Sequence, residues 1–201
     1  MKVHFDEQPG LQGQRIGVAT LAAAQSLNAL DLPMIEALQA RLGAWADDPE
    51  IACVLLRGAG DKAFCAGGDV RQLVDACRQH PGEVPPLAAR FFADEYRLDY
   101  RLHTYPNPLL CWGHGHVMGG GMGLLQGAGV RIVSEHSRLS MPEINIGLYP
   151  DVGGSWFLSR LPGRFGLFLA LSGAQINAHD ALQMGLADRV LLDSQQDALL
   201  A

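Results

Sequence analysis

Apolar residues occur along the chain in two alternating patterns, continuous short runs and runs with helical spacing. Continuous runs lie at 51–56 and 109–112, and runs of this length are typical of strands buried on both faces. We expect a third buried strand at 130–133. Between them, apolar residues recur every three to four positions from Ile35 onward and again over 88–104. Asp31 is placed to cap the first of these helices, with Pro33 in its first turn. The alternation of strands and helices predicts an α/β fold.

The remaining segments complete this pattern. Two β-prone runs, 3–5 and 15–21, are separated by turn residues and predict an opening hairpin. We expect a helix of about ten residues after the loop 62–69, a surface break at 80–86, and a short strand that turns into a loop at 137–146. Helices are expected at 154–161, at 165–172 and after Asn177, and a last strand at 189–192. One core should span 1–192, and 193–201 should begin a C-terminal helical region in a truncated chain.

Composition narrows the class of protein. Of 201 residues, 48% are hydrophobic and 18% charged, which is enough for one packed core. The net charge of −6 argues against nucleic acid as a partner, because phosphate binding needs clustered Lys and Arg. Four cysteines at wide spacings indicate reduced thiols and no zinc site. No window approaches the roughly 20 apolar residues of a membrane span, and the first residues lack a leader pattern, so we expect a soluble cytoplasmic protein.

Two glycine clusters carry the candidate chemistry. Gly67-Gly68 comes after the first buried strand, and Gly119 to Gly121 come after the second, at the start of a helix. Glycine lets backbone N–H groups approach a ligand closely, and two converging amides form an oxyanion hole, in which the loss of one donor costs about 10²- to 10³-fold in rate. For either cluster alone, a role in tight turns or close helix packing remains the alternative. The segment 58–63 fits a dinucleotide-binding pattern but does not open a helix, so we set it aside.

Three segments together resemble the signature of the crotonase (enoyl-CoA hydratase/isomerase) superfamily. They are KAFCAGGD at 62–69, HVMGGGMG at 116–123 and MPEINIG at 141–147, and the resemblance extends from about residue 15 to 192. It implies a crotonase-like ββα spiral fold that binds an acyl-CoA thioester. It also implies that the amides of Gly68 and Gly120 form the oxyanion hole. The other substrate-binding positions carried over are Ala66, Gly67, Asp69, Gly119 and Gly121.

The carboxylates indicate a branch of this superfamily. Its hydratases carry a second glutamate where this chain has Gly123, which argues against ordinary hydration. Glu143 and the segment containing Asp151 (PDVGG) resemble the branch that hydrolyses 3-hydroxyisobutyryl-CoA. That resemblance implies that Glu143 activates water or attacks the thioester and that Asp151 positions substrate or water. It further implies a role in valine catabolism and a homo-oligomer, with coenzyme A present only as part of the substrate and no metal or redox cofactor. An enoyl-CoA isomerase or hydratase and a non-catalytic acyl-CoA-binding subunit remain alternatives.

Several single residues can also be interpreted individually, in structural as well as functional terms. Glu143 lies in an apolar run, where burial would raise its pKa toward that of a general base, whereas Asp151 could instead cap a helix that begins at residue 154. His114 and His116 alternate along a strand, and we favour a structural role over metal binding. Cys65 is expected to pack as a small apolar side chain and not to act as a nucleophile. Whether Lys62 or Arg71 contacts the phosphates of coenzyme A stays open.

Overall fold

A hairpin and a helix open the chain, as the apolar pattern predicts. The strands β1 (Val3–Pro9) and β2 (Arg15–Leu21) pair antiparallel, and α1 (Leu32–Ala46) follows. Asp31 caps α1, since its Oδ1 accepts a hydrogen bond from the Met34 amide at 2.9 Å. The described part of this computed structural model is residues 2–200.

The larger of two sheets is built on the continuous apolar runs. It consists of β1, β2, β3 (Ile51–Gly58), β5 (Leu109–Gly113), β7 (Val130–Ser134) and β10 (Arg189–Leu191), in the spatial order β1-β2-β3-β5-β7-β10. From β2 onward all neighbours are parallel. The three strands that the sequence predicts as buried, β3, β5 and β7, therefore lie next to one another, and their interior position explains why apolar residues predominate in them.

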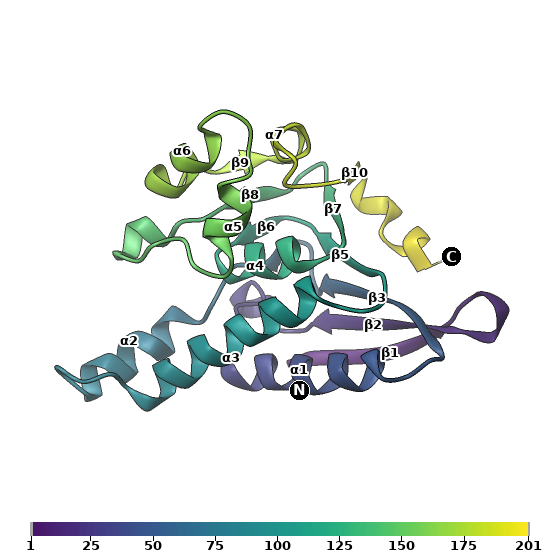
Figure 1. Cartoon of the computed structure of the whole chain (residues 1–201), viewed down its shortest axis with the longest axis horizontal. Coiled ribbons are helices and arrows are strands. Elements are labelled where there is room, and N and C mark those ends of the chain that lie inside the picture. Colours follow the sequence, from purple (N-terminus) through teal and green to yellow (C-terminus); the bar gives the residue numbers. More distant parts are fainter. Residues whose placement is uncertain (1, 201) are drawn as a thin grey trace.

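The second sheet is small, and its first three strands each follow a strand of the larger sheet along the chain. Its order is β4 (Ala63–Cys65), β6 (His116–Met118), β8 (Arg138–Ser140) and β9 (Ile176–Asn177). The chain bends from β5 into β6 at Gly115, which has a φ of +54°. We expected β4 to be loop and did not foresee β9, because strands of two or three residues carry no periodic signal. Figure 1 shows this sheet between the larger sheet and the C-terminal helices.

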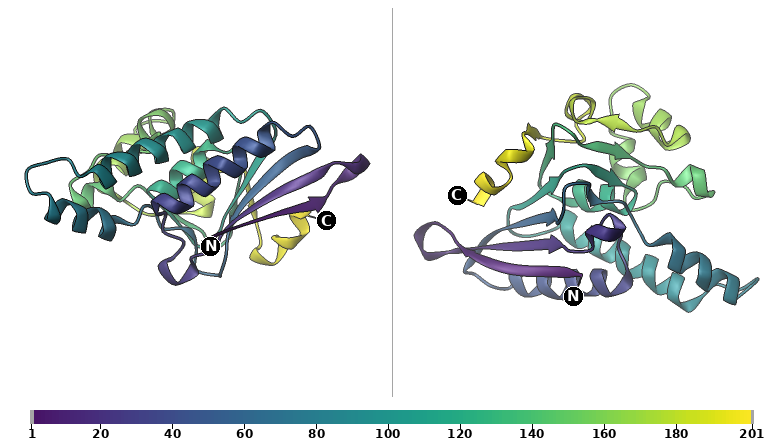
Figure 2. Two further views of the ribbon diagram at one scale, coloured as in Figure 1. Left: turned by 90° about the horizontal axis from the view of Figure 1, so that it is seen from below. Right: turned by 180° about the vertical axis from the view of Figure 1, so that it is seen from behind.

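Helices cover both sheets. They are α2 (Val70–Gln79), α3 (Pro86–His103), α4 (Gly120–Gly127), α5 (Gly154–Leu158), α6 (Phe165–Ser172) and α7 (Ala178–Met184). The long helices α1 and α3 pack against each other on one side of the molecule, and α3 also packs on α4 (Figure 2). Two short 3₁₀ helices, Asp193–Gln195 and Asp197–Leu200, follow β10; that they begin a larger helical region stays a prediction. Among the described helices, none combines the length and apolar composition needed to cross a bilayer.

Candidate active site

The two glycine clusters meet because the strands that precede them are neighbours. β4 pairs in parallel with β6, so Ala66–Gly68 and Gly119–Gly120 leave the same edge of the small sheet. Gly67 and Gly119 have φ values of +100° and +51°, which side chains rarely allow. A Cβ at Gly67 would stand only 3.1 Å from the carbonyl oxygen of Met118 and 3.4 Å from the amide nitrogen of Gly120. The loops therefore contact each other backbone to backbone.

Two amides at this contact are available to a ligand. Within residues 2–200, neither the Gly68 nor the Gly120 amide donates a hydrogen bond to the protein. A Cβ at Gly120 would lie 3.5 Å from the Gly68 nitrogen, so the two donors are close together. Gly120 is also the first residue of α4, where the helix dipole places positive charge. This arrangement can stabilise negative charge on a carbonyl oxygen.

A cavity of about 640 Å³ opens beside these amides. Both glycine loops form one wall, and apolar side chains of α2 and α3, among them Leu73, Phe91 and Phe92, form another. A larger groove of about 1030 Å³ lies between α1 and α3, but no predicted site residue lines it. We therefore take the smaller cavity, called the acyl cavity below, as the candidate active site.

Glu143 lies at the start of a 3₁₀ helix directly after β8, and it lines the acyl cavity. Only 6% of the residue is exposed. Its Oε1 lies 2.9 Å from where a Cβ of Gly119 would stand, and its buried Oε2 has no hydrogen-bond partner among the described residues. Burial, with a smaller contribution from Asp151, raises the pKa of Glu143 to about 7. A carboxylate with this pKa and a free oxygen can accept a proton at neutral pH.

Asp151 also lines the cavity, and its side chain is held by a tyrosine. Tyr96 of α3 donates a hydrogen bond from Oη to Asp151 Oδ2 at 2.8 Å. Burial is the main reason that the pKa of Asp151 is raised. The capping alternative fails, because the N-cap of α5 is Gly153 and no side chain caps that helix.

Two further carboxyl groups enter from α3, and the sequence analysis missed both. Glu95 is 3% exposed and lines the acyl cavity, with Oε1 2.5 Å from the position of a Cβ at Gly120. Burial first, and then the nearby carboxylates led by Asp99, raise the pKa of Glu95 to about 9. Glu95 is therefore a neutral acid at pH 7, able to donate a hydrogen bond into the cavity.

Asp99 follows one turn later on the same helix. Both of its carboxylate oxygens are shielded from solvent and have no hydrogen-bond partner within residues 2–200. Burial, reinforced by Asp151, holds the pKa of Asp99 well above its ordinary value. A signal for Glu95 was present in the sequence, because it falls on the helical stripe of Phe91, Leu98 and Leu102 that packs inward.

The remaining predicted positions divide into two groups. Ala66, Gly67 and Gly119 line the acyl cavity beside Gly68 and Gly120. Asp69 and Gly121 do not line it. Asp69 precedes α2 and accepts a hydrogen bond from Gln72, and a Cβ at Gly121 would stand 2.2 Å from the Cys65 carbonyl oxygen. Gly121 thus permits close packing of α4 on β4, the alternative role kept open for the glycine clusters.

Neighbouring histidines and basic residues lie elsewhere. The prediction that His114 and His116 share one strand is wrong: β5 ends at Gly113, and the bend at Gly115 separates them. Lys62 lines a different cavity, of about 280 Å³. Arg71 does not line the acyl cavity, whereas Arg78 at the end of α2 does. Cys65 is fully buried, and burial raises the pKa of its thiol to about 12, in keeping with apolar filler.

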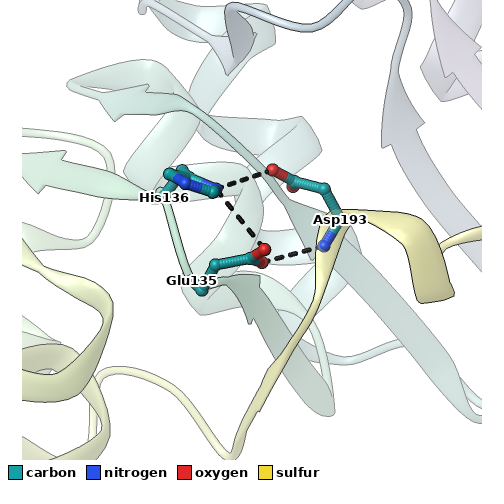
Figure 3. Close-up of side chains that lie close together, drawn as sticks. All are labelled: Glu135, His136 and Asp193. Atoms are coloured by element: carbon teal, nitrogen blue, oxygen red, sulfur yellow. Dashed lines mark hydrogen bonds and ion pairs between the residues drawn. The ribbon is translucent and has the colours of Figure 1, made fainter.

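A second polar cluster lies at the surface, where Glu135, His136 and Asp193 meet (Figure 3). His136 Nδ1 lies 3.1 Å from Asp193 Oδ2, and the Asp193 amide donates to Glu135 Oε2 at 2.8 Å. These bonds tie the turn between β7 and β8 to the chain after β10. The three residues satisfy one another, and the expectation that the protein binds no metal stays a prediction.

Solved structures share this fold. An enoyl-CoA hydratase from Rhodobacter sphaeroides 2.4.1 matches with a TM-score of 0.92 and 38% identity, over 100% of this chain and 57% of that one. A carnitinyl-CoA dehydratase from Mycobacterium thermoresistibile matches with a TM-score of 0.90 and 38% identity, over 98% and 55%. The expected α/β crotonase fold is confirmed.

Several curated relatives share the name "3-hydroxyisobutyryl-CoA hydrolase, mitochondrial". The protein from Xenopus tropicalis is 46% identical over 85% of this chain and 43% of its own length, and the human protein is 41% identical over 92% and 46%. The chain thus spans less than half the length of these relatives. Their names contradict the cytoplasmic location that we expected. The physical reason is that unpaired cysteines indicate a reducing compartment without identifying which one.

A family model identifies the wider group. The model described as "Enoyl-CoA hydratase/isomerase" matches residues 16–201, nearly the whole chain. The three segments that suggested this family from the sequence all lie inside that match. The chain belongs to the enoyl-CoA hydratase/isomerase family.

Proposed function

We propose that the protein hydrolyses a short-chain β-hydroxyacyl-CoA thioester, 3-hydroxyisobutyryl-CoA, to the free acid and coenzyme A. The observation that carries this proposal is the free Oε2 of Glu143 in a cavity that also holds the unpaired amides of Gly68 and Gly120. The names of the curated relatives support the same reaction. In the cell this activity would serve valine catabolism.

In the proposed reaction the thioester carbonyl oxygen accepts hydrogen bonds from Gly68 and Gly120. Glu143 either removes a proton from water or attacks the carbonyl carbon itself. In the second route the attack expels the thiolate of coenzyme A and leaves a mixed anhydride, which water cleaves to the free acid and the Glu143 carboxylate while the remaining proton goes to the thiolate. In the first route the water oxygen bonds to that carbon and the carbonyl electron pair moves onto oxygen, where the two amides stabilise it. The tetrahedral intermediate then expels the thiolate of coenzyme A, which takes the proton from Glu143. No metal or redox group takes part in these steps.

The other carboxyl groups fit a substrate with a β-hydroxyl. Asp151, held by Tyr96, positions the substrate or water. Glu95 is neutral at pH 7 and faces the cavity beside Gly120, so it can donate a hydrogen bond to a hydroxyl oxygen. Hydration is disfavoured, because Gly123 places no carboxylate where hydratases of this family have one. A Cβ there would also stand 2.6 Å from the Cβ of Val152.

Release of free thiol from 3-hydroxyisobutyryl-CoA by the full-length protein tests the proposal, with crotonyl-CoA as the comparison substrate. Glu143→Gln should reduce kcat by about 10²- to 10⁴-fold, the range expected for loss of a general base. Glu83→Gln, at an exposed site in the break before α3, is the matched control and should leave kcat unchanged. Conversion of an enoyl-CoA without thiol release would favour an isomerase. Binding of acyl-CoA without any turnover would favour a non-catalytic subunit.

A further inference from the structure

The backbone directly after Asp151 adopts a conformation that its sequence disfavours. Val152 and Gly153 have φ values of +43° and +81°, and the Gly154 amide donates to the Asp151 carbonyl oxygen at 2.6 Å. These are the features of a type I′ turn, whose central positions favour Asn, Asp and Gly. Valine is branched at Cβ and is a true outlier in the left-handed region. Such strain persists only where surrounding contacts hold it, and it concentrates at functional sites.

The contact that holds Val152 is made with Gly123, a glycine of α4 that Asp99 of α3 also approaches. A Cβ at Gly123 of α4 would lie 2.6 Å from Val152 Cβ and 3.1 Å from its Cγ2, so only glycine leaves room for the valine. Asp99 Oδ1 of α3 lies 2.9 Å from the same point. Val152 is 4% exposed. Its side chain is therefore wedged against α4 at Gly123, and the carboxyl group of Asp99 approaches the same glycine.

The turn also divides two cavities. Asp151 lines the acyl cavity, whereas Val152 and Gly153 line a second cavity of about 370 Å³ with Asp99, Gly123 and Trp156. Tyr96 borders this second cavity and bonds Asp151 across the division. The side chains of consecutive residues 151 and 152 thus face opposite sides of one partition. Because the two residues are adjacent, holding the Val152 side chain in the second cavity directs the Asp151 side chain toward the acyl cavity.

We propose that Val152 is a positioning residue, whose wedge against Gly123 directs the Asp151 carboxylate into the acyl cavity and onto Tyr96. This inference rests on the proposed function only in giving Asp151 a role in turnover. The placement of Asp151 by Val152 is a separate property of the chain that can be measured without a substrate.

A double-mutant cycle tests the functional part in the full-length protein. Val152→Gly removes the wedge while allowing the turn, and it should lower kcat for thiol release by about 10²-fold, the cost of misplacing a catalytic group by about 1 Å. The KM should change little. In an Asp151→Asn background the same change should have no further effect, because Val152 acts through Asp151. Losses that simply multiply would show a general structural role and overturn the proposal.

The control applies the same backbone change far from the site. Gln12 lies at the exposed tip of the β1–β2 hairpin with a φ of +55°, so Gln12→Gly also relieves left-handed strain. It should leave kcat unchanged. A loss matching that of Val152→Gly would attribute the effect to backbone loosening in general and contradict the assignment.

The carboxyl-carbon NMR signal of Asp151, assigned with Asp151→Asn, gives a readout without turnover. Burial raises the pKa of Asp151 in the native turn. In Val152→Gly, release of the side chain toward solvent should move that pKa back toward its ordinary value. An unchanged titration would overturn the positioning role. If the wild-type protein releases no thiol and Val152→Gly still changes the titration of Asp151, the proposed function is refuted and the positioning role stands.

Discussion

Glu143 begins the 3₁₀ helix that follows β8, where it is buried and its Oε2 has no hydrogen-bond partner among the described residues. The apolar surroundings disfavour its charged form and bring its pKa to about 7. As a base or nucleophile, Glu143 must be ionised. We therefore expect kcat/KM for thiol release to rise with pH through about 7 and to level off above it. A pH–rate profile checks this, and a profile that is flat from pH 5.5 to 8.5 would remove Glu143 from the proton-transfer step.

The raised pKa of Glu95 affects the stability of the fold, which should fall as pH rises. Its folded-state pKa of about 9 lies above its ordinary value of 4.5, so between these values the folded state holds a proton that the unfolded state has lost. Its contribution to the free energy of unfolding is thus fully present below about pH 4.5 and is lost as pH rises toward 9, by at most about 1.4 kcal/mol per pH unit.

Glu95→Gln keeps the shape of the side chain without the charge. Urea denaturation between pH 5 and 9 should show a flatter dependence on pH than in the wild type, and greater stability at the alkaline end. Glu83→Gln, in an exposed loop, should reproduce the wild-type slope. Equal slopes for all three proteins would mean that Glu95 ionises freely in the fold.

At the scale of elements, α4 reaches the edge of the small sheet only because its first turn is glycine. A Cβ at Gly121 would collide with the Cys65 carbonyl oxygen of β4, at 2.2 Å. Gly121→Ala should therefore lower the free energy of unfolding by about 1–3 kcal/mol, as overpacking does in well-packed cores. Gly129→Ala, where the nearest atom is 3.7 Å from the new Cβ, should have little effect. Urea midpoints for the two variants measure the difference, and equal midpoints would contradict this account of α4.

Elements with a strong periodic signal could be predicted from the sequence. The buried strands, the long helices α1 and α3 and the caps at Asp31 and Asn177 fall where their patterns indicate. The strands β4 and β9 are too short for any period to appear. The bend at Gly115 could not be predicted either, because a single glycine between two histidines also fits a continuous strand.

The site was partly predictable for a related reason. The glycine loops and Glu143 lie in local segments with distinctive composition. Glu95 and Asp99 lie on an amphipathic helix, where acidic residues are normally assigned to the solvent face. Their burial depends on α4 and the Asp151 turn, which pack against α3 from distant parts of the sequence. The role of Val152 depends on Gly123, 29 positions earlier in the chain, and no local pattern contains both.

For the whole molecule, the grouping of acidic side chains around the acyl cavity alters the charge that the folded protein presents. Glu95 keeps its proton at neutral pH, since burial raises its pKa to about 9, and burial also raises the pKa of the neighbouring Asp99. The proton on Glu95 makes the folded protein about one unit less negative than its formal charge of −6. Its native isoelectric point should lie above the 5.6 calculated from composition. Unfolding would release that proton, so the chain becomes a stronger polyanion when its core opens.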